Sequence, residues 1–158
     1  MNTVRPPGPG LHAFPRHVPL LLAAFTFLFA LRVLGQLLTL FMDVSYLPPF
    51  ERWDSGLIAY PLLLPIQIAL LGLMIAITRD FARGRGFFVR LSPRAGRYLK
   101  YASYLYALVM ATRYVLTMTL NSELRWFTGT TPIWFHFVLA AFLFTLGQAL
   151  AARNRTTR

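Results

Sequence analysis

Two arginines lie inside long apolar stretches of this sequence, where a charged side chain is rare. Arg32 interrupts the stretch that begins at Val18, and Arg113 interrupts the stretch that begins at Tyr98. A charge at the centre of a membrane-spanning helix costs about 2.5–3.5 kcal/mol on insertion scales, so it marks either a functional site or an ion pair. A guanidinium group donates several hydrogen bonds and accepts none. Both arginines are therefore predicted to hold negative charge or carbonyl oxygens.

Other polar side chains fall at a similar depth. Gln36 lies one helical turn beyond Arg32, while Gln67 and His136 lie near the starts of two further apolar stretches. At 1.5 Å per residue, Arg32 lies roughly 15 Å, and Arg113 roughly 10 Å, from the nearer end of its segment. Together with one acid from a connecting segment, they predict a polar ligand pocket of Arg32, Gln36, Gln67, Arg113, His136 and Asp54. Structural pairing of the arginines with acids or glutamines remains an open alternative.

The same residue types could perform acid–base chemistry. Asp54 or Glu51 would be the base and His136 the proton shuttle, while the arginines would stabilise developing negative charge. No nucleophile motif, Walker loop or dinucleotide fingerprint occurs in the sequence. The spacing of histidines and acids is not that of a metal site, so no metal is predicted and any cofactor stays unknown. The sequence leaves open whether the chain is an enzyme.

Four apolar segments must position these side chains. Four segments, residues 18–42, 60–78, 98–120 and 132–151, have about the 20 residues or more that a helix needs to cross a bilayer. The 158-residue chain is 56% hydrophobic and only 13% charged, whereas a soluble domain is about 25% charged. The predicted fold is all-α, a four-helix transmembrane bundle formed by residues 18–151.

The distribution of charge predicts how the bundle is oriented. The 79–100 connection carries seven basic residues and one acid, and both ends of the chain are basic, whereas the 43–59 connection carries three acids and one arginine. Basic connections remain on the cytoplasmic side of a membrane. We therefore expect cytoplasmic N and C termini, with residues 1–17 as a flexible tail and 152–158 as a basic tail. The predicted location is a bacterial-type inner membrane.

The basic connection is first of all a topology signal, but it could also bind anionic lipid headgroups. The residues predicted at the membrane surface are Arg79, Arg83, Arg85, Arg90, Arg94, Arg97 and Lys100. The net charge of +11 would suggest nucleic acid in a soluble protein. Because no nucleic-acid-binding fold accompanies the charge, nucleic acid is not an expected partner.

The four-span plan with both ends inside resembles small bacterial membrane families such as the quinone-linked thiol oxidases and the cytochrome-type anchor subunits. The thiol oxidases need cysteines, and this chain has none. The anchor subunits need paired haem histidines, and His136 is the one histidine inside an apolar segment. The resemblance is therefore one of architecture, and no family is assigned.

The sequence favours a small polytopic membrane protein without catalytic activity. It would be an accessory subunit, or a binder of a lipid-like or anionic small molecule in a pocket of the outer leaflet. A membrane-embedded enzyme acting on a lipid or quinone-like substrate is the first alternative, and an oligomeric channel or transporter is the second. The expected partners are membrane lipids, together with partner subunits or further copies of this chain.

Overall fold

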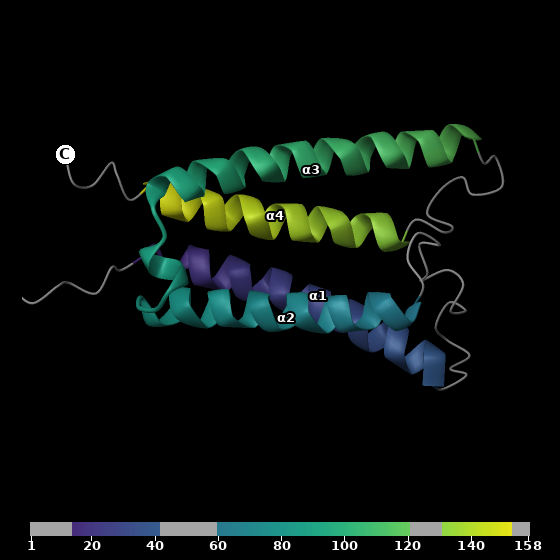
Figure 1. Cartoon of the computed structure of the whole chain (residues 1–158), viewed down its shortest axis with the longest axis horizontal. Coiled ribbons are helices and arrows are strands. Elements are labelled where there is room, and N and C mark those ends of the chain that lie inside the picture. The colour runs from purple at the N-terminus through teal and green to yellow at the C-terminus, as the bar shows by residue number, and fades with distance from the viewer. Residues whose placement is uncertain (1–13, 42–59, 121–130, 153–158) are drawn as a thin grey trace, which may run out of the picture.

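The computed structural model describes residues 14–41, 60–120 and 131–152, and every regular element in these ranges is helical. The long helices are α1 (His17–Phe41), α2 (Tyr60–Arg83), α3 (Pro93–Leu120) and α4 (Thr131–Ala152), and a 3-10 turn, η2 (Phe88–Arg90), connects α2 to α3. Figure 1 shows the four long helices side by side along the longest axis of the molecule. The predicted all-α fold is confirmed.

Three of these helices are long and apolar enough to cross a membrane, judged by length and composition over the described residues. The qualifying stretches are His17–Thr39, Leu62–Arg83 and Ile133–Ala152. Only 17% of the apolar window in α2 is buried inside the protein, so most of its apolar surface requires a lipid or protein environment. The 28-residue α3 does not qualify, because Arg113 and several tyrosines dilute its apolar character.

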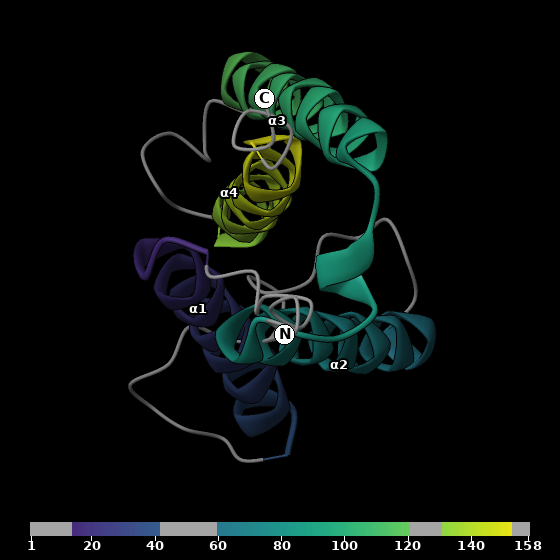
Figure 2. The same cartoon turned by 90° about the vertical axis from the view of Figure 1, so that its left-hand side faces the viewer.

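The helices pack as a curved row in the order α3, α4, α1, α2. The contact between α3 and α4 is the most extensive, and α1 packs against both α4 and α2. Figure 2, which views the bundle from one end, shows α3 at the edge of the row beside α4 alone. Among the described residues, no comparable contact joins α2 to α3.

A stripe of buried residues at intervals of three and four explains how α1 packs. Val18, Leu22, Phe29 and Val33 belong to the hydrophobic core together with residues of α2 and α4, which is the spacing expected for one face of a helix. Gln36 continues this stripe and is fully buried. A polar residue thus occupies what would otherwise be a core position.

The helices α3 and α4 approach each other closely through glycines. A Cβ added to Gly96 would lie 2.8 Å from the carbonyl oxygen of Gly147, and one added to Gly147 would lie 2.7 Å from the backbone nitrogen of Lys100. Neither position has room for a side chain. Small residues at a crossing let two backbones pack directly, which is a common way of associating helices in membranes.

Local interactions explain where α2 ends and where α3 begins. α2 extends to Arg83, beyond the predicted end at residue 78, because Gly84, with φ of 61°, ends the helix in a left-handed conformation. α3 begins at Pro93, where Ser92 Oγ accepts a hydrogen bond from the backbone N–H of Ala95 at 3.2 Å. Ser92 is therefore the N-cap of α3.

Candidate functional site

A pair of buried amides joins α1 to α2. Gln67 Nε2 donates a hydrogen bond to Gln36 Oε1 at 2.9 Å, and the Gln67 side chain is only 3% exposed. A second polar link, between the hydroxyl oxygens of Thr26 and Thr78 at 3.1 Å, lies further along the same helix pair. Hydrogen bonds of this kind hold helices together where the surroundings are apolar.

Arg32 lies one turn from Gln36 and is 7% exposed. Its guanidinium carbon lies 5.4 Å from the centre of the Phe135 ring, which belongs to α4. A cation over an aromatic face is attracted by about 0.5–2 kcal/mol, which is small compared with the penalty for burying a charge. The Arg32 Nε atom is buried and has no hydrogen-bond partner in the described part of the chain.

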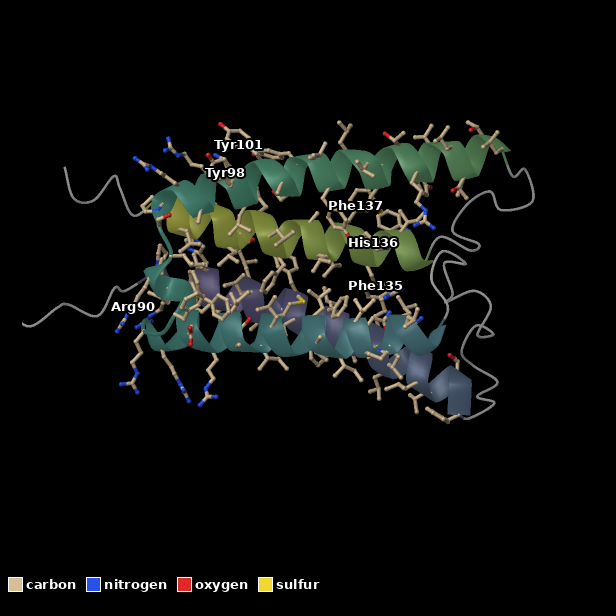
Figure 3. The ribbon with its side chains drawn as sticks, viewed as in Figure 1. Arg90, Tyr98, Tyr101, Phe135, His136 and Phe137 are labelled. Carbon is tan, nitrogen blue, oxygen red and sulfur yellow. The ribbon has the colours of Figure 1, made fainter. Side chains whose placement is uncertain are left out.

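A tyrosine and a histidine join α3 to α4. The Tyr106 hydroxyl oxygen lies 2.5 Å from Nδ1 of His136, and the two rings meet edge to face with their centroids 5.8 Å apart. Either group can be the donor, depending on the imidazole tautomer. In Figure 3, Phe135 points from α4 toward α1 and α2, while Phe137 lies on the side of α4 that faces α3.

Arg32 connects these two pairs into one polar centre, which we define as Arg32, Gln36, Gln67, Tyr106 and His136. Phe135, which packs under the Arg32 guanidinium, directly precedes His136 in the sequence. The positive charge of Arg32 acts electrostatically on both Tyr106 and His136. The polar centre therefore draws residues from all four long helices.

Arg113 lies at the margin of this centre. Its charge also acts on the imidazole of His136, and its side chain is half-buried. It lines a shallow groove of about 500 Å³ whose described walls belong to α3, among them Thr112, Leu116 and Thr117. Arg113 thus contributes charge to the centre from one side.

Negative charge is scarce around these arginines. Within the described ranges the one acidic residue is Asp80, which lies in the last turn of α2, near Arg83, while Arg32 and Gln67 lie toward the other end of the bundle. The two arginines thus have no acidic partner among the described residues. Within the described ranges, Arg32 is a buried charge without a counter-charge.

The structure brings some of the predicted pocket residues together. Gln36 and Gln67 are in direct contact, and Arg32 and His136 belong to the same centre. Asp54 and Glu51, the two candidates for the base, lie outside the described residues, and so does the predicted place of Asp54 in the pocket. No group of three or more histidine, cysteine or acidic side chains that could hold a metal occurs in the described part.

Sequence reasoning missed Tyr106 and Phe135. In the sequence Tyr106 looks like Tyr104 and Tyr114, which lie in the same apolar segment and make ring contacts with Phe144 and Trp134 respectively. One signal could have identified Tyr106. It lies seven residues before Arg113, and this spacing places both residues on one face of a helix.

No protein-family model, curated protein or solved structure matches this chain. The fold and the polar centre are therefore the basis for assigning a function.

Proposed function

We propose that this chain is a multi-pass protein of a bacterial-type inner membrane, with four spans and both termini in the cytoplasm. What supports this is the apolar character of α1, α2 and α4, together with the basic residues between α2 and α3. α3 would be the fourth span, since its 28 residues are long enough to cross a bilayer. Packing against α4 would compensate for the low apolar content of α3 in a bilayer.

Within that membrane, the protein would bind a lipid-like or anionic small molecule through the polar centre. The observation that carries the proposal is Arg32, a charge that is 7% exposed and whose Nε atom has no hydrogen-bond partner among residues 14–41, 60–120 and 131–152. Gln67 Oε1 is a second buried atom without a partner in the same ranges. Unsatisfied buried polar atoms are costly, typically about 1–3 kcal/mol each and more when charged.

A ligand would remove that cost by supplying oxygens to the guanidinium group. Phosphate, carboxylate and quinone-type carbonyl oxygens all accept hydrogen bonds from arginine. Arg113 would add long-range attraction for a negative group, while Tyr106 and His136 would orient it. An accessory-subunit role would use the same residues, with the oxygens supplied by a partner subunit.

The test is purification from the native membrane in mild detergent, followed by mass spectrometry of everything that stays bound. We expect a defined small molecule bound to the wild-type protein and its loss from Arg32→Leu and Gln67→Leu. Gln148→Leu is the matched control, because Gln148 is an exposed residue near the other end of α4. Equal retention by all variants would refute the pocket, and a stoichiometric protein partner in place of a small molecule would identify an accessory subunit.

A second candidate function is chemistry on a lipid or quinone-like substrate. The observation that favours it is the 2.5 Å contact between Tyr106 and His136 beside a guanidinium group, an arrangement that can move a proton and stabilise an oxyanion. If an activity is found, His136→Gln should reduce its kcat and change its pH profile. An unchanged profile would exclude His136 as the proton shuttle.

A further inference from the structure

The end of the bundle where α2 stops and α3 starts carries a dense set of cations, and we call it the basic end. It comprises Arg79, Arg83, Arg85, Arg90, Arg94, Arg97 and Lys100. All six arginines are exposed and Lys100 is half-buried. Figure 3 shows Arg90 pointing outward at this end of the molecule. A topology signal needs such charges but places no demand on their arrangement.

The backbone at the basic end is nevertheless built by several specific interactions. The Gly84 N–H donates to the carbonyl oxygen of Phe81 at 3.2 Å, and the Arg85 N–H donates to that of Asp80 at 3.2 Å. These two bonds and the positive φ of Gly84 make a complete Schellman motif. Val89 of η2 is buried in the core, and it fixes the connection against the bundle.

The Asp80 side chain fixes the turn that follows. Its Oδ2 accepts a hydrogen bond from the backbone N–H of Phe88 at 3.1 Å. Gly86 has φ of 133°, and a Cβ at this position would collide with the Asp80 carboxylate. Asp80, the one acid in the described ranges, therefore orders the turn that carries Arg85 and leads to Arg90.

Aromatic rings accompany the charges. Phe87 is 71% exposed and stands edge to face against Phe88, with ring centroids 5.3 Å apart. Tyr98 and Tyr101 are exposed on the outer face of α3, as Figure 3 shows. Exposed aromatic rings next to arginines at the ends of apolar helices are typical of residues at the headgroup level of a membrane.

We propose that the basic end is a preorganised binding surface for anionic phospholipid headgroups, in which Asp80 and Gly86 hold the turn that carries Arg85 and leads to Arg90. The phosphates of an anionic leaflet would be bound by the arginines, and Phe87 would enter the acyl boundary. This surface lies outside the polar centre and does not depend on the function proposed for it.

A preorganised surface and simple charge attraction predict opposite effects of Asp80→Ala on binding to an anionic leaflet. Asp80→Ala removes a negative charge, so simple attraction would strengthen binding to an anionic leaflet. If Asp80 orders Arg85 and Arg90 through the turn, the same substitution weakens binding in spite of the lost negative charge. Gly86→Ala tests the arrangement with no change of charge at all.

The experiment reconstitutes the full-length protein in vesicles of equal parts phosphatidylglycerol and phosphatidylcholine, then counts the lipids retained on release by native mass spectrometry. We expect wild type to be enriched in phosphatidylglycerol, and Asp80→Ala and Gly86→Ala to lose about fivefold in enrichment for each arginine displaced. Gly72→Ala is the matched control, since nothing lies within 4 Å of a Cβ at that position. The double variant Arg155→Gln and Arg158→Gln is a second control, because it removes positive charge outside the basic end.

Unchanged or greater enrichment in Asp80→Ala would overturn the proposal, as would wild-type enrichment in Gly86→Ala. Equal retention of both lipids by the wild-type protein would also overturn it. Circular dichroism and gel filtration in detergent identify any variant that fails to fold, and Phe87→Ala then provides a milder test with the same expected direction. Arg32→Leu should retain full enrichment, which separates this surface from the polar centre.

Discussion

At the scale of single residues, the burial of Arg32 distinguishes a binding role from a structural one. A buried charge without a counter-charge destabilises a fold, and replacing such groups with apolar side chains of similar volume is often neutral or stabilising by about 1–4 kcal/mol. We expect Arg32→Met to maintain or raise the Tm of the ligand-free protein while it abolishes ligand retention.

Thermal unfolding in detergent provides the measurement, with Arg97→Met, at an exposed site, as the control. A large drop in Tm for Arg32→Met alone would mean that Arg32 serves to hold the helices together. The binding proposal for the polar centre would then lose its main support.

The Tyr106–His136 pair yields a second prediction at this scale. Tyr106→Phe removes the hydroxyl group and leaves the ring, so it should destabilise the protein by about 1 kcal/mol through the lost hydrogen bond. Tyr104→Phe is the matched control, because it keeps the ring contact with Phe144. Comparable Tm values for the two variants would show that the 2.5 Å contact contributes little to stability.

The polar centre shows which residues a sequence can identify. Arg32, Gln36 and Gln67 are conspicuous because polar groups are rare in apolar segments, and the structure brings the two glutamines into contact. Tyr106 and Phe135 are not conspicuous, since aromatic residues are common in such segments. Their roles depend on which helix faces which, and that is set by packing between segments distant in sequence.

At the scale of helices, the crossing of α3 and α4 at Gly96 and Gly147 is the contact that leaves the least room for a side chain. Gly96→Leu or Gly147→Leu would force the two backbones apart, and we expect each to destabilise the protein by about 1–3 kcal/mol or more. Gly72→Leu on α2 should have little effect because its surroundings are open. Tm values and the yield of folded protein report the difference, and equal behaviour of all three variants would contradict the crossing.

The length of the apolar segments predicts that the helices exist. It predicts less well where each helix ends. The sequence predicts that the apolar segment ends at residue 78 and that Arg79, Asp80 and Arg83 belong to the connection that follows. The structure keeps them helical until Gly84, since arginine and alanine are good helix formers and a positive φ is what stops the helix.

At the scale of the whole molecule, the absence of cysteine from the sequence allows a clean test of topology. Arg90→Cys and Leu120→Cys place single thiols near the two ends of α3, and both native residues are exposed. If α3 spans the membrane with the basic end inside, a membrane-impermeant maleimide added to intact cells should label Leu120→Cys alone. Labelling of both variants, or of Arg90→Cys alone, would refute the proposed orientation.

The edge position of α3 in the row of helices has a consequence for biosynthesis. α3 is the least apolar of the four helices and packs chiefly against α4, which the ribosome makes last. We expect α3 to wait at the translocon until α4 emerges, and the two to enter the bilayer together as a hairpin closed by Gly96 and Gly147. A nascent chain that ends before residue 131 would then leave α3 outside the lipid while α1 and α2 are already integrated.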